Sequence, residues 1–208
     1  MGLVRRDTSP QVGKERSQAP AYDLLERHLN SPDPELRREA ALELDGWDEA
    51  VPALLGRLDV ESEPAVCDAI LTTLVGYDTG PVAARLVGHL AGEDTGLRIA
   101  VADALAAMPE STLSLLPDLL VDPDHDVRIM TAMVLANMRH PEAESWLVAM
   151  VRGDAHPNVV TAAIDALLPS ARAEHAPLLQ EAMRRFPDDP FLRFVVETTV
   201  PRLAGTYR

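Results

Sequence analysis

Three aspartates alternate along one segment of the chain, at Asp122, Asp124 and Asp126, and this spacing resembles the start of a calcium-binding loop. Such a loop needs a glycine at its sixth position for the sharp turn and a bidentate glutamate at its twelfth. The sequence has Val127 and Met133 at those two positions. We therefore expect the three aspartates to begin a helix, and we predict no metal site here.

No other set of residues forms a recognisable catalytic or metal-binding motif. The six histidines are scattered without HExxH spacing, and the single cysteine, Cys67, excludes an internal disulfide and an all-cysteine metal site. No Ser/His/Asp arrangement, glycine-rich phosphate loop or Cys/His nucleophile pair can be assembled from local spacing. We predict no catalytic residue and no cofactor, so a non-enzymatic protein is favoured while the question of activity stays open.

The composition limits the choice of partners. The chain has 208 residues, of which 47% are hydrophobic, and a net charge of −14. Such an acidic protein repels a phosphate backbone, so we predict no binding to nucleic acid. We find no apolar run of about 18 residues and no signal peptide, so we predict no membrane association and a cytoplasmic location.

The first part of the chain differs from the rest. Residues 1–20 are polar, net basic and without apolar periodicity, so we predict a disordered tail. Residues 21–29 place three leucines on one side of a short helix. We expect this helix to be the first of the domain formed by residues 21–208 and to cover the end of that domain.

An internal repeat organises that domain. One apolar position returns with steps of 30, 31, 30, 32 and 33 residues, and it is occupied by Leu36, Val66, Leu97, Val127, Val159 and Leu192. Internal periods of roughly 20 to 50 residues are typical of solenoids. We place the repeats near 33–58, 63–90, 94–120, 122–151 and 154–186, with a C-terminal cap at 189–203.

Each repeat begins with residues that favour a helix start. Acids such as Asp33 and Asp94 stand where free backbone N–H groups accept a cap, and prolines such as Pro34 and Pro157 stand where a missing N–H costs little. Inside each first helix the apolar residues recur at spacings of three and four residues. A second helix with a less regular pattern follows each first helix. The repeat is therefore a pair of helices.

These units resemble HEAT repeats, in particular the short HEAT-like repeats of the phycobilisome bilin-lyase class. The resemblance covers residues 21–203 and is carried by Asp33-Pro34, Leu36-Arg37 and Ala40-Ala41. It implies an all-α fold, a right-handed α-solenoid or superhelix of about five to six helical hairpins. It also implies a ladder in which the acid and the arginine bond between adjacent repeats. Cys67 and Val160 replace the arginine, so we expect interruptions at repeats two and five.

The resemblance also predicts where a partner binds, because in stacks of this type the second helices line the concave side. Their outward polar positions, by helical spacing, are Arg57, Arg85, His89, Asp118, Glu144, Arg152, Glu181, Arg184 and Arg185. The mixed signs of these charges suit a protein or peptide better than nucleic acid.

We therefore predict a non-enzymatic protein-binding scaffold, an adaptor or an assembly or regulatory factor, which could form a hetero-oligomer with its partner. The alternative that follows the resemblance is a bilin-lyase-like subunit or chaperone that handles a linear tetrapyrrole. A third hypothesis is a relative of DNA-repair glycosylases. Its weakness is that a chain with 4% aromatic residues and a strong negative charge has little with which to build a basic, aromatic-lined groove.

Overall fold

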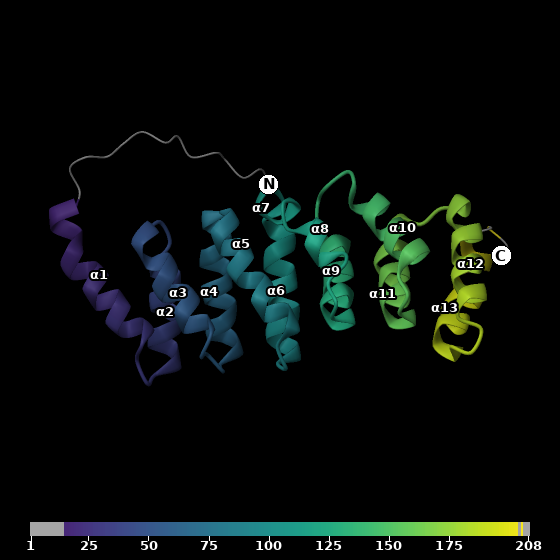
Figure 1. The fold of residues 1–208 in the computed structure, drawn as a ribbon. Coiled ribbons are helices and arrows are strands. Elements are labelled where there is room, and N and C mark those ends of the chain that lie inside the picture. The colour runs from purple at the N-terminus through teal and green to yellow at the C-terminus, as the bar shows by residue number, and fades with distance from the viewer. Residues whose placement is uncertain (1–14, 204, 206–208) are drawn as a thin grey trace. The chain divides into compact units, whose positions relative to one another are not determined.

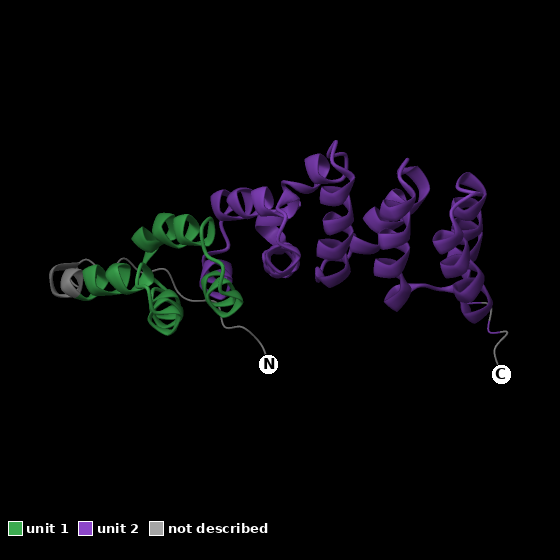
Figure 2. Ribbon diagram, turned by 90° about the horizontal axis from the view of Figure 1, so that it is seen from below, with its two compact units in different colours: residues 1–70 green, residues 71–208 purple. Residues whose placement is uncertain are grey.

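The structure, a computed structural model, describes residues 15–203 and Gly205. Within these residues the chain forms thirteen α-helices and four short 3-10 helices, and no strand, which confirms the all-α prediction. The chain divides into two compact units, residues 1–70 and 71–208, which Figure 2 shows in different colours. The boundary between them falls within helix α4 (Pro64–Tyr77).

Unit 1 begins with α1 (Glu15–Leu29), which contacts α2 (Pro34–Glu43) and α3 (Val51–Leu58); η1 (Asp48–Ala50) leads into α3. Its core is built from fully buried leucines, namely Leu29, Leu44, Leu54 and Leu58. Most of the predicted disordered tail, residues 1–14, lies outside the described residues. Residues 15–20 belong to α1, so this helix begins earlier than the sequence pattern predicted.

Unit 2 contains the rest of the array. In chain order its elements are α5 (Gly80–Val87), η2 (Gly88–Ala91), α6 (Thr95–Ala107), α7 (Pro109–Leu113), α8 (Leu116–Leu119), α9 (His125–Asn137), α10 (Ala143–Gly153), α11 (Pro157–Leu167), η3 (Leu168–Ser170), η4 (Ala173–His175), α12 (Ala176–Arg185) and α13 (Pro190–Leu203).

The helices of unit 2 stack in consecutive pairs, as Figure 1 shows. The first helices form one row, in which α6 contacts α9, α9 contacts α11 and α11 contacts α13. The second helices follow beside them, with α10 against α12. At the repeated apolar position Val127, Val159 and Leu192 are buried in this stack, whereas Leu97 is half-buried. Each pair thus covers the apolar side of its neighbour, as expected of a solenoid.

The predicted helix starts are capped by acids. The carboxylates of Asp33 and Asp94 accept hydrogen bonds from the N–H groups of Glu35 and Leu97, two and three residues further on. In the alternating acidic segment Asp124 is the cap of α9, and Asp122 in turn accepts a hydrogen bond from the Asp124 N–H at 2.8 Å. These carboxylates therefore stabilise the loop and the helix start, as the sequence predicted.

The second helix of the third repeat is broken into α7 and α8. The cause is Pro117, since it has no N–H to donate to the carbonyl of Leu113, four residues earlier, at the end of α7. The chain turns at Ser114 and Leu115 and starts again as a single helical turn. Across the described residues, no helix combines the length and the apolar character that a membrane span requires.

Candidate functional site

The repeats of unit 1 are joined by a buried ion pair. The guanidinium of Arg37, on α2, binds both carboxylate oxygens of Glu61, with Nε–Oε2 at 2.7 Å and Nη2–Oε1 at 2.9 Å. Its third nitrogen donates to the carbonyls of Ser31 and Pro32, six and five residues earlier. One arginine therefore links the loop before its own helix to the loop before the next repeat.

The Glu61 carboxylate has an unusually complete set of donors. Besides Arg37 it accepts hydrogen bonds from Arg57 Nε at 2.9 Å and from the N–H groups of Ser62 and Glu63. Burial alone would raise the pKa of Glu61, but these hydrogen bonds, with that from Arg37 the strongest, outweigh it and lower the pKa to about 2. Glu61 is therefore ionised in the folded protein at neutral pH.

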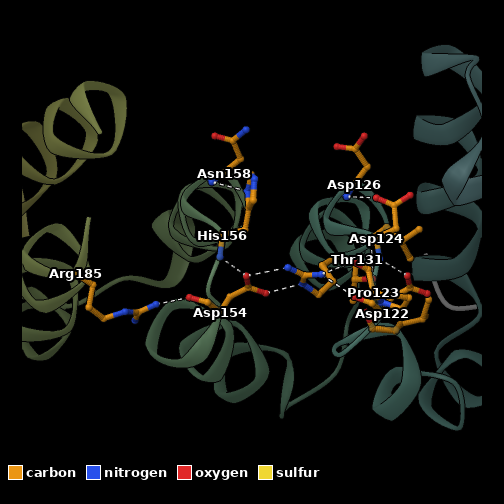
Figure 3. A network of polar contacts seen from close by, with 12 residues as sticks. Asp122, Pro123, Asp124, Asp126, Thr131, Asp154, His156, Asn158 and Arg185 are labelled. Atoms are coloured by element: carbon orange, nitrogen blue, oxygen red, sulfur yellow. Dashed lines mark hydrogen bonds and ion pairs between the residues drawn. The ribbon is translucent and has the colours of Figure 1, made fainter. Parts of the chain in front are cut away.

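The same link recurs in unit 2 between repeats four and five. Arg128, on α9, binds the carboxylate of Asp154 with Nε–Oδ2 at 2.7 Å and Nη2–Oδ1 at 3.1 Å. It also donates to the carbonyls of Asp122 and Pro123, again six and five residues earlier (Figure 3). The hydrogen bonds to Asp154 raise the pKa of Arg128 further above its ordinary value. The Asp154 carboxylate also accepts from the His156 N–H at 2.8 Å.

Arg98 occupies the same position in the third repeat but makes a weaker contact. Its Nη2 donates to the carbonyl of Asp126 at 3.5 Å. Its Nε is buried, with no hydrogen-bond partner in the part of the chain that the structure describes. The ladder therefore varies in strength from repeat to repeat.

Arg185 takes over the backbone contact that Val160 cannot make. A side chain at position 160 would reach the Asp154 carbonyl, six residues earlier, but valine has no donor. Arg185 reaches it instead from the end of α12 and also binds the carbonyls of Val151 and Arg152, the former at 2.8 Å. Figure 3 shows Arg185 pointing at the backbone of Asp154. The predicted interruption at repeat five is thus bridged by an arginine of the following second helix.

One repeat earlier, an open groove of about 450 Å³ lies between the end of α8 and α10. We call it the α8–α10 groove; it is lined by Leu120, Val121, Arg128, Ala149, Met150, Gly153, Asp154 and Ala155. Most of these side chains are apolar, and Val121 at its edge is 74% exposed. The two charged residues, Arg128 and Asp154, neutralise each other in the ion pair just described. The groove thus offers apolar walls to a ligand.

The nine predicted partner-binding residues have different environments. Asp118, Arg152, Glu181 and Arg184 are exposed on α8, α10 and α12. Arg85 on α5 is exposed and His89 on η2 is half-buried, and both residues make contacts within the protein.

The other three serve the fold. Arg57 binds Glu61, Glu144 pairs with Arg172, and Arg185 caps three carbonyls. Helical spacing could not detect the contacts of Glu144 and Arg185, because it gives the direction of a residue and not how far a long side chain reaches to residues about thirty positions away. The partner of Arg57 lies only four residues further along, but beyond the end of α3. The α8–α10 groove was also missed, since it forms between residues about thirty apart in sequence.

With stacked helical pairs, capped starts and an arginine ladder, the protein is an α-solenoid. The sequence pattern of HEAT repeats matches residues 112–197, which supports a HEAT-repeat array in this part of the chain. A comparison with curated proteins found no match.

The buried pair of Arg37 and Glu61 predicts that replacing the Glu61 carboxylate by an amide strongly lowers the stability of the fold. We expect Glu61→Gln to reduce the free energy of unfolding by about 3–5 kcal/mol, because it removes one partner of a pair in which Arg37 is 7% exposed and the Glu61 side chain 0%. The measurement is urea denaturation followed by circular dichroism. The control is Glu35→Gln, which breaks the exposed pair with Arg38 and should cost less than about 1 kcal/mol. Equal effects of the two variants would contradict the buried-pair interpretation.

The low pKa of Glu61 predicts a dependence of stability on pH. Because the pKa falls from 4.5 to about 2 on folding, this carboxylate stabilises the protein fully above pH 4.5 and loses its effect as the pH falls towards 2. The difference in unfolding free energy between the wild type and Glu61→Gln should therefore shrink by roughly 2–3 kcal/mol across that range. Denaturation curves at several pH values measure it, and a constant difference would refute the shifted pKa.

Two adjacent arginines on α12 provide a matched pair of variants. Arg185→Gln should lower the free energy of unfolding by about 1.5–3 kcal/mol, since it leaves the carbonyls of Val151, Arg152 and Asp154 without their charged donor. Arg184→Gln, at an exposed neighbouring position, should change it by no more than about 0.5 kcal/mol. Thermal or urea denaturation of both variants tests this. A loss of stability for Arg184→Gln as large as that for Arg185→Gln would rule out the capping role.

Proposed function

We propose that this protein is a non-enzymatic binding scaffold that holds a protein partner on the face formed by its second helices. We call this face of unit 2, made by α8, α10 and α12, the second-helix face. The observation that carries the proposal is the α8–α10 groove, which lies on this face between two repeats. HEAT repeats are in general protein-interaction scaffolds.

The chemistry of the second-helix face suits a protein partner. Its exposed charges are of both signs, with Arg152 and Arg184 at corresponding places on α10 and α12, and Asp118 and Glu181 on α8 and α12. Exposed Val121 adds an apolar contact beside the groove. An apolar centre with a mixed polar rim is the usual make-up of a protein–protein interface.

The face also needs little ordering before it binds. The loops at its edge are held by the bonds of Arg128 and Arg185 to backbone carbonyls of adjacent repeats. A surface that is already ordered loses less conformational entropy on association, so more of the contact energy appears as affinity. A solenoid extends this advantage over successive repeats.

Charge reversal on the second-helix face tests the proposal. We expect Arg152→Glu combined with Arg184→Glu to weaken capture of the natural partner at least about tenfold, with an unchanged helical circular dichroism spectrum, because opposed charges at an interface suppress association. The measurement is quantitative affinity capture from the native cell, followed by titration of the protein that co-purifies.

The control is the double variant Arg139→Glu and Arg202→Glu, which makes the same charge change at exposed positions outside the second helices. It should bind as the wild type does. If both double variants lose binding equally, or if neither does, the partner does not use the second-helix face.

A further inference from the structure

We propose that the α8–α10 groove takes an arginine side chain of the partner protein, bound by its aliphatic stem and its guanidinium group. This inference rests on the proposed function and specifies the chemistry that the second-helix face recognises. Two successive inter-repeat positions within unit 2 differ: one is filled by an arginine of the protein itself, and the other is open.

The filled position lies between α10 and α12. There Arg185 extends from the end of α12 and donates to the carbonyls of Val151, Arg152 and Asp154 at the end of α10. The protein thus shows with its own side chain that a guanidinium fits between the ends of two consecutive second helices.

The open position lies one repeat earlier. Buried residues align the helices: Leu179 and Ala182 of α12 correspond to Leu147 and Met150 of α10, which places Gly153 where α12 has Arg185. By the same alignment, Leu116 and Leu119 of α8 are buried like Leu147 and Met150. The segment Leu120–Val121 therefore corresponds to Val151–Arg152.

Gly153 leaves room at this position. A Cβ atom added to it would meet no atom within 4 Å, so the position at which the Arg185 side chain begins in the next repeat is open here. Both Gly153 and the pair Leu120 and Val121 line the groove, on its opposite sides.

The groove also contains free acceptors. Within the described residues no group donates a hydrogen bond to the carbonyl oxygens of Leu120 and Val121, whereas the corresponding carbonyls of Val151 and Arg152 are both bound by Arg185. An arginine of a partner can supply the missing donors, because its planar guanidinium reaches several carbonyls at once.

The surroundings favour a cation with an apolar stem. The walls provided by Leu120, Ala149 and Met150 suit the methylene groups of an arginine. Arg128 and Asp154 neutralise each other. The segment that flanks the groove-lining residues Leu120 and Val121 carries three carboxylates, Asp118, Asp122 and Asp124, which outnumber the two cations near Gly153 and Asp154, Arg152 and Arg185. Charge complementarity therefore selects a basic side chain over a neutral apolar one.

Two peptides test the proposal on the full chain. Each is a fluorescein-labelled glycine–serine peptide with one central residue between two leucines, which is arginine in the first and its uncharged analogue citrulline in the second. We expect the wild-type protein to bind the arginine peptide at least about tenfold more tightly than the citrulline peptide, as measured by fluorescence anisotropy. Equal affinities for the two peptides would overturn the inference.

Variants of Gly153 provide a second test that needs no natural partner. Gly153→Arg should fill the groove from within, so that it binds the arginine peptide at least about tenfold more weakly than Gly153→Ala does, and Gly153→Ala should stay within about twofold of the wild type. The melting temperature of Gly153→Arg should also exceed that of Gly153→Ala by roughly 3 °C, since the new side chain caps the free carbonyls. A Gly153→Arg protein that melts no higher than Gly153→Ala would refute the fit of an arginine in the groove.

The natural partner separates this inference from the proposed function. If capture is lost with the Arg152 and Arg184 charge reversals but unaffected by Gly153→Arg, the second-helix face binds the partner and the arginine inference is wrong. Loss of capture with Gly153→Arg and not with Gly153→Ala supports both.

Discussion

The structure depends on one interaction, the arginine that joins a loop of its own repeat to the loop of the next. In Arg37 and Arg128 two guanidinium nitrogens bind a carboxylate 24 and 26 residues further along, and the third binds carbonyls five and six residues earlier. The loops between helices carry backbone carbonyls that have no helical partner, and leaving such groups unpaired and buried is costly. The arginine satisfies them and fixes the spacing of successive repeats at the same time.

The residue at the arginine position differs from repeat to repeat, and this variation explains why the space between successive second helices is open in one repeat and filled in the next. Where Arg128 is present, its own loop is bound, and the groove beyond it stays open with Gly153 on its wall. Where Val160 stands instead, Arg185 enters from the next second helix and occupies the corresponding space. One repeat therefore has an open groove at a place that is filled in the next repeat, so the second-helix face of a regular fold is irregular.

The sequence was sufficient to predict the fold because apolar spacing and helix-start residues are local signals. The regular steps from Leu36 to Leu192 predicted the series of helical pairs, and Asp33 and Asp94 indicated where two of the first helices start. The break between α7 and α8 follows from Pro117. It was not predicted, because a proline near the start of a helix is compatible with a regular helix and does not by itself indicate a break. The bonds of Arg57 to Glu61 and of Arg185 to backbone carbonyls were not predicted, because helical spacing gives the direction of a side chain and not its partners.

The coupling between Arg128 and Asp154 is the most direct measure of how strongly an arginine joins two adjacent repeats. A double-mutant cycle with Arg128→Ala, Asp154→Ala and the combined variant isolates the interaction from the other contacts of each residue. With side chains 14% and 7% exposed, we expect a coupling free energy of about 1.5–3 kcal/mol from urea denaturation. A coupling below about 0.5 kcal/mol, with additive losses of stability, would show that the repeats are held by apolar packing alone.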